Sequence, residues 1–105
     1  MAHNLDSVCR SAMAHWGFPA QADILQEECG ELIVALSHAR RLRPESEKEL
    51  LEEAVDVYIM VRQIMNELDQ DKVQSMIQHK LGRTVDLIRE ERVRKGQPKP
   101  AILGN

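Results

Sequence analysis

The stretch ILQEECGELIVALSHARR, residues 24–41, decides the fold class, because it reads as a helix that carries acidic residues on its apolar side. Its apolar residues recur at intervals of three and four, which is the period of an α-helix. We expect a helix over residues 20–42 with an inward stripe of Leu25, Cys29, Leu32, Leu36 and Ala39. Glu28 lies roughly 60° from the centre of this stripe and Glu31 roughly 120°. Both carboxylates therefore fall within or at the edge of the apolar side, whereas Glu27 should face water.

Three further segments have the helical period, and no segment alternates with period two for long enough to predict a strand. We expect these helices over residues 4–15, 47–68 and 71–94, with Ser46 and Glu49 spaced as a capping box at the start of the third helix. The sequence thus predicts an all-α bundle of four helices, which forms one domain over residues 1–105. Prolines at 98 and 100 favour an extended tail over residues 96–105.

The composition argues against several classes of protein. The 14 basic and 17 acidic residues give a net charge of −3, which does not suit a general nucleic-acid binder. The sequence has no signal peptide and no long apolar run, and its two cysteines form no motif, so we expect a cytoplasmic protein without membrane association. The helices carry more apolar surface than one small chain covers. We therefore expect a homo-oligomer, either a dimer or a dimer of dimers.

The expected third helix repeats the acidic arrangement of the second. Measured from Leu50 in its apolar stripe, Glu53 lies roughly 60° away and Asp56 roughly 120°. Glu52 points outward. Gly30, in the middle of the second helix, costs about 1 kcal/mol relative to alanine, so we expect another backbone to approach closely there.

The spacing predicts that the acidic residues of the two helices meet. Glu28 and Asp56 are each 14 positions from Leu42, and Glu31 and Glu53 are each 11 positions from it. In an antiparallel hairpin that turns at Leu42, residues equidistant from the turn stand at the same height. Four carboxylates would then converge, and burying unpaired carboxylates is costly. A hard divalent cation with oxygen ligands relieves that cost, and Mg²⁺ is the obvious candidate.

The two acidic runs, Glu27-Glu28-Cys29-Gly30-Glu31-Leu32 and Glu53-Ala54-Val55-Asp56, together resemble the signature of the MazG-like all-α nucleoside triphosphate pyrophosphohydrolases. The resemblance covers most of the chain, from the region of Trp16 to the helix that contains Lys80. It implies hydrolysis of a nucleoside triphosphate to the monophosphate and pyrophosphate with Mg²⁺, or Mn²⁺ as a substitute, to remove non-standard or surplus nucleotides. It also implies that the metal ligands are Glu28, Glu31, Glu53 and Asp56.

The last helix matches the family only in part. Lys80 stands where the family often has a lysine, but Thr84 replaces its asparagine and Ile88 its tyrosine, which suggests a subtype. Lys80 and Arg83 are either phosphate contacts or solvated side chains whose stems cover apolar surface. Trp16 and its neighbour Phe18 are either anchors of the first helix or walls of a base pocket.

No histidine, serine or cysteine is placed to act as a nucleophile, so we expect attack by water, with Glu28 or Glu31 as the base. Two other functions compete with this one. A carboxylate-bridged di-iron bundle uses Glu-x-x-His pairs, and no histidine here lies three residues after a glutamate. A non-catalytic helical interaction module with a solvated acidic face stays open as the alternative.

Overall fold

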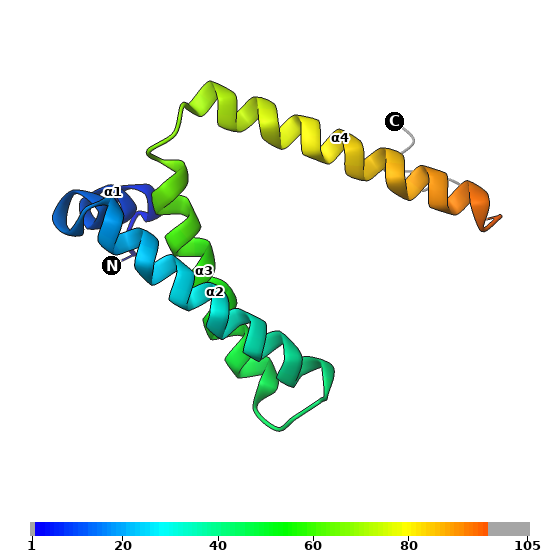
Figure 1. Cartoon of the computed structure of the whole chain (residues 1–105), viewed down its shortest axis with the longest axis horizontal. Coiled ribbons are helices and arrows are strands. Elements are labelled where there is room, and N and C mark those ends of the chain that lie inside the picture. Colours follow the sequence, from blue (N-terminus) through cyan, green and yellow to red (C-terminus); the bar gives the residue numbers. More distant parts are fainter. Residues whose placement is uncertain (1, 97–105) are drawn as a thin grey trace. The chain divides into compact units, whose positions relative to one another are not determined.

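The computed structural model of the chain describes residues 2–96, which form four α-helices and no β-strand (Figure 1). The helices are α1 (Leu5–Trp16), α2 (Phe18–Arg40), α3 (Ser46–Met65) and α4 (Gln70–Arg94). The all-α prediction is therefore confirmed, and each helix begins and ends within three residues of its expected limits. The extended tail expected over residues 96–105 lies, apart from Gly96, outside the described residues.

The chain divides into two compact units between Leu68 and Asp69. The first unit contains α1, α2 and α3, and the second contains α4. None of the described helices is both long and apolar enough to cross a membrane.

Short-range hydrogen bonds explain where α1 and α4 begin. The side chain of Asn4 accepts from the backbone N–H of Ser7 at 2.9 Å, and Asp69 accepts from Lys72 at 3.1 Å. The expected capping box at Ser46 is wrong, because Ser46 is already helical and α3 has no side-chain cap. The carboxylate of Glu49 instead lies 2.9 Å from Nδ1 of His38.

Helices α2 and α3 form the antiparallel hairpin that the spacing predicts. The amide nitrogen of Gln21 donates to Oε1 of Gln63 at 2.6 Å, and both residues are 21 positions from Leu42. Leu42 itself lies in the turn with a φ of 54°. Near the turn, the contact between His38 and Glu49 joins the same two helices. Two polar contacts thus fix the height at which the helices face each other.

The side of α2 that faces α3 differs from the expected stripe. Gln21 and Ala35 are buried, and Glu28 lies midway between them at a spacing of seven residues. Residues seven apart occupy one side of a packed helix pair. This side is about 60° from the leucine stripe, so Cys29 and Leu36, which were expected inside, are exposed.

Helix α1 packs against α3 at the end of the hairpin far from the turn. Cys9 and Met13 are buried, as expected, and the thiol of Cys9 lies 3.7 Å from the carbonyl oxygen of Ile59. Arg62 donates a hydrogen bond to Asp6 on α1. Burial, followed by the negative charge of Asp6, raises the pKa of the Cys9 thiol, as expected for a packed rather than a reactive cysteine.

Because Gln21 and Gln63 are buried and hydrogen-bonded to each other, replacing one of them should lower the free energy of unfolding more than replacing both. Gln63→Leu leaves the amide of Gln21 without its partner, which should lower the free energy of unfolding by about 1–3 kcal/mol. The double variant Gln21→Leu/Gln63→Leu should recover most of that loss. Urea denaturation of the wild type, both single variants and the double variant measures the coupling, and simply additive losses would contradict the pairing. Gln26→Leu, at an exposed position of α2, is the control.

Candidate metal centre

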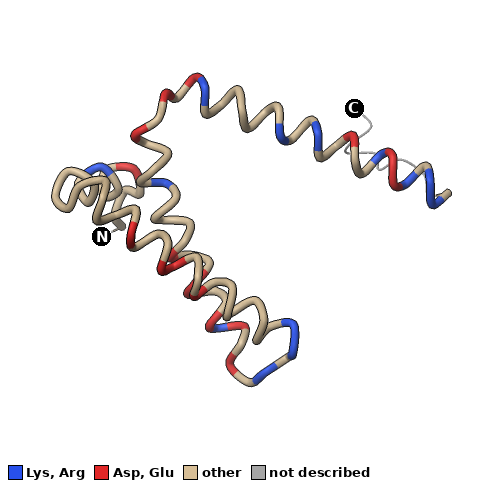
Figure 2. Tube along the Cα trace, viewed as in Figure 1, with Lys and Arg blue, Asp and Glu red and all other residues tan. Residues whose placement is uncertain are grey.

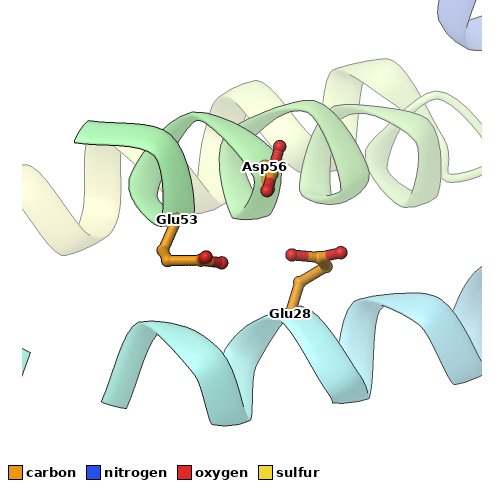
Figure 3. Close-up of side chains that lie close together, drawn as sticks. All are labelled: Glu28, Glu53 and Asp56. Carbon is orange, nitrogen blue, oxygen red and sulfur yellow. The ribbon is translucent and has the colours of Figure 1, made fainter. Parts of the chain in front are cut away.

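Three carboxylates from the two hairpin helices lie together. One oxygen from each of Glu28, Glu53 and Asp56 lies within 4.8 Å of the others. Figure 3 shows Glu28 of α2 and Glu53 of α3 reaching toward each other between the helices, with Asp56 beside them on α3. Glu28 and Glu53 are half-buried, whereas Asp56 is exposed, so the cluster is open to solvent on the Asp56 side.

Glu31 stands at the edge of this cluster. It is an exposed residue of α2, one turn beyond Glu28. Its charge and its hydrogen bonds nevertheless act on both Glu28 and Glu53. The structure therefore brings together all four acidic residues, which the sequence places as two facing pairs about one helical turn apart.

The cluster disfavours the charged form of its buried members. Burial, followed by hydrogen bonding to Glu31 and the charges of Glu31, Asp56 and Glu28, raises the pKa of Glu53 to about 7. Burial, followed by the charges of Glu31 and Asp56, also raises the pKa of Glu28. In addition, Oε2 of Glu28 and Oε2 of Glu53 are buried and have no hydrogen-bond partner. Buried oxygens of this kind are costly unless a proton or a cation satisfies them.

Contacts on both sides of the cluster hold the helices at this distance. The Gln21–Gln63 bond lies on one side and the His38–Glu49 contact on the other. The small side chain of Ala35, which is fully buried, occupies the position seven residues after Glu28. Because these contacts join α2 and α3 on both sides of the cluster, the carboxylates cannot relieve their repulsion by simple separation of the two helices.

Phe18, one of the two aromatic residues considered for a base pocket, does not lie beside the carboxylates within the first unit. Trp16 is 60% exposed and Phe18 is 54% exposed, so the first of the two alternatives, that they anchor the first helix inside a core, is wrong for the described residues. Phe18 precedes Glu28 by ten residues on α2, which corresponds to about 15 Å along the helix axis. The ring of Trp16 instead meets His15 edge-on, with centroids 5.0 Å apart. The role of Trp16 in a base pocket stays a prediction.

The other expected substrate contacts lie on α4, in the second unit. Lys80, Arg83 and Thr84 are exposed, and their spacing places them on one side of the helix. The hydroxyl of Thr84 donates to the carbonyl of Lys80 at 3.0 Å, so its hydrogen is used within the helix. Whether these side chains reach a phosphate stays a prediction.

Two details of the acidic run differ from expectation. A Cβ atom placed on Gly30 would meet nothing within 4 Å, so the expected close approach of another backbone is wrong for the described residues. Gly30 lies on the opposite side of α2 from Glu28. The Gln21–Gln63 bond was not predicted from the sequence. Its signal was the spacing of seven residues that separates Gln21 from Glu28 and Asp56 from Gln63.

No protein-family model, curated protein or solved structure matches the chain. A function is therefore inferred from the carboxylates themselves.

The raised pKa of Glu53 predicts a pH-dependent gain in stability from Glu53→Gln when no metal ion is present. At a pH well below its ordinary pKa of 4.5, Glu53 is protonated in both the folded and the unfolded state, so it does not lower the stability of the wild type. As the pH rises toward about 7, the unfolded state releases the proton first, and the folded wild type loses stability relative to the glutamine variant.

Thermal unfolding in a chelating buffer, from about pH 4.5 to above pH 7, measures this difference. The stability advantage of Glu53→Gln over the wild type should grow across that interval. Glu52→Gln, which removes an outward charge from the next position, should show no comparable growth. An advantage of Glu53→Gln that is constant with pH would contradict the assigned electrostatics.

Proposed function

We propose that the chain is a Mg²⁺-dependent nucleoside triphosphate pyrophosphohydrolase of the MazG-like type. It hydrolyses ribo- or deoxynucleoside triphosphates to the monophosphate and pyrophosphate. The observation that carries the proposal is the convergence of four carboxylates from two facing helices, with an unpartnered buried oxygen on Glu28 and another on Glu53. The resemblance of the two acidic runs to the MazG-like signature supports the same conclusion.

The residues present suit a hard divalent cation. They offer carboxylate oxygens only, which are the ligands that Mg²⁺ and Mn²⁺ prefer. Glu28, Glu31, Glu53 and Asp56 would hold the ion, and Asp56 and Glu31 lie on the side that solvent and substrate reach. A bound divalent cation polarises phosphate oxygens and stabilises charge on a pyrophosphate leaving group.

The remaining chemistry falls to the side chains of the chain. Among the described residues, no histidine or cysteine joins the carboxylate cluster. His38 lies nearer the turn and is engaged by Glu49, so we take water as the attacking group. Glu28 and Glu31 are the candidate bases. The raised pKa of Glu28 brings it closer to the working pH of a general base, and Glu31 stands at the solvent edge, where it can accept a proton from water.

We further propose roles for residues outside the α2–α3 hairpin. Lys80, Arg83, Thr84 and Trp16 would contact the substrate, Lys80 and Arg83 through its phosphates. The four helices would form the MazG-like bundle within a homo-oligomer. The cellular role would be removal of non-standard or surplus nucleotides in the cytoplasm.

The alternative function, a non-catalytic interaction module, is favoured by the exposed apolar side chains of the first unit, such as Ile33 at 68% and Leu51 at 65%. Thermal melting separates the two functions. If the carboxylates hold a cation, Mg²⁺ at about 100 times its dissociation constant should stabilise the protein by about 2.7 kcal/mol and raise the melting temperature. An unchanged melting temperature over a wide range of Mg²⁺ would favour the interaction module.

Substitutions of the acidic residues test the activity. Glu31→Gln and Asp56→Asn should abolish pyrophosphate release while the fold stays intact or becomes more stable, because each removes one charge from a repelling cluster. Glu27→Gln and Glu52→Gln, which change outward residues by the same chemistry, should retain turnover. A panel of nucleoside triphosphates provides the substrates, and equal losses in the inner and outer variants would contradict the site.

The position of attack can be read from the products. Hydrolysis in ¹⁸O-labelled water should place the label in the nucleoside monophosphate, because attack at the α-phosphorus releases unlabelled pyrophosphate. Formation of a nucleoside diphosphate and orthophosphate would overturn the proposed reaction.

A further inference from the structure

Gln21 and Gln63 form a polar pair although both residues are buried. Gln21 is 2% exposed and Gln63 is 4% exposed, and Nε2 of Gln21 donates to Oε1 of Gln63 at 2.6 Å. Oε1 of Gln21 is buried without a hydrogen-bond partner. Nε2 of Gln63 donates only to Sδ of Met60 at 3.5 Å, and a thioether is a weak acceptor. Two apolar residues of similar size would avoid the loss of stability that such incomplete pairing brings. Stability alone therefore gives no reason for this glutamine pair.

The glutamine pair does give the two helices a fixed register. Apolar side chains tolerate sliding of one helix along another, whereas a hydrogen bond forms only at one height and over a narrow range of distances. On the turn side, the short connection between α2 and α3 and the contact between His38 and Glu49 hold the helices. Figure 2 shows acidic residues recurring along both helices of the hairpin, and their repulsion favours separation. The glutamine pair opposes sliding and separation at the end far from the turn.

This register determines how the carboxylates face one another. Glu28 follows Gln21 by seven residues on α2, and Asp56 precedes Gln63 by seven residues on α3. Both carboxylates are thus about 10 Å along the helices from the glutamine pair, which is too far for the glutamines to contact an ion held by the carboxylates. A shift of α2 by one residue would move Glu28 about 1.5 Å along α3. By comparison, Mg²⁺ and Ca²⁺ differ by only about 0.4 Å in their distance to ligand oxygens.

We propose that Gln21 and Gln63 are positioning residues that make the carboxylate site selective for Mg²⁺ over Ca²⁺. Mg²⁺ demands near-ideal octahedral geometry with short bonds, whereas Ca²⁺ accepts about six to eight oxygen ligands in flexible geometry. Helices held in one register keep the carboxylates in the arrangement that Mg²⁺ needs. Helices that are free to shift serve Ca²⁺ equally well. The inference rests on the proposed metal centre and adds the residues that determine its choice of ion.

The competing interpretation is that the glutamine pair contributes only to folding. The double variant Gln21→Leu/Gln63→Leu separates the two roles, because it removes the directional bond while apolar side chains fill the same space. A pair that serves folding alone would leave the preference between the two ions unchanged in a folded variant. A positioning pair would lose the preference for Mg²⁺ while the protein stays folded.

Isothermal titration calorimetry with Mg²⁺ and with Ca²⁺ measures the two dissociation constants. In the double leucine variant the Mg²⁺ constant should rise at least about tenfold, the lower end of what residues around metal ligands contribute. The Ca²⁺ constant should change much less, because Ca²⁺ tolerates varied ligand geometry. Met60→Leu changes a buried residue of α3 but leaves the bond between Gln21 and Gln63 in place, so it should keep the wild-type ratio of the two constants.

Circular dichroism and urea denaturation check that each variant is folded. Gln21→Met/Gln63→Met, which keeps the length of both side chains, should give the same change and replaces the leucine variant if that variant does not fold. A wild-type ratio of the two constants in a folded double variant would overturn the proposal, whether both constants are unchanged or both rise alike. Equal affinity of the wild type for the two ions would overturn it too. Failure of the wild type to bind either ion would instead contradict the proposed metal centre itself, and the selectivity with it.

Discussion

The burial of like-charged carboxylates between α2 and α3 is the constraint on which the rest of the first unit depends. Glu28 and Glu53 each have an oxygen that is buried without a hydrogen-bond partner. Such a pair would separate two helices that nothing else joined. The hairpin joins them on both sides of the cluster, through Gln21 and Gln63 at one end and through His38 and Glu49 at the other. The Gln21–Gln63 and His38–Glu49 contacts thus hold the carboxylates of Glu28 and Glu53 close together.

This arrangement gives the two sides of the hairpin different surfaces. Asp56 and Glu31 are exposed and open the carboxylate cluster to solvent. The leucines of α2 are turned to another side, where Leu36 remains half-exposed. Within the first unit, the buried side chains among the described residues are Cys9, Met13, Gln21, Ala35, Met60 and Gln63. The same rotation that places Glu28 between α2 and α3 turns the leucines of α2 away from α3.

The helices and the height at which the acidic residues meet were predicted from the sequence, because both follow from the spacing of residues along the chain. The hydrogen bond between Gln21 and Gln63 joins residues that are equidistant from Leu42, by the rule that paired Glu28 with Asp56. The rotation of α2 was not predicted. Apolar periodicity identifies the side that carries leucines, and here the side that touches α3 carries glutamine, glutamate and alanine instead.

Two local predictions from the sequence were wrong because the packing of α2 against α3 decides which contacts form. Ser46 and Glu49 have the spacing of a capping box, but Glu49 has His38 of the neighbouring helix within reach. Gly30 suggested a close contact, yet open space surrounds it in the described part of the chain. Neither outcome is visible in a local pattern, since each depends on which side of α2 meets α3.

The central claim is that the four carboxylates bind a divalent cation, and electron paramagnetic resonance of Mn²⁺ tests it most directly. The signal of free Mn²⁺ should decrease on addition of the wild-type protein, and added Mg²⁺ should restore it by competition. Glu28→Gln/Glu53→Gln should leave the free signal nearly unchanged, whereas the outward double variant Glu27→Gln/Glu52→Gln should bind as the wild type does. Equal binding by the two double variants, or no binding by the wild type, would contradict the account.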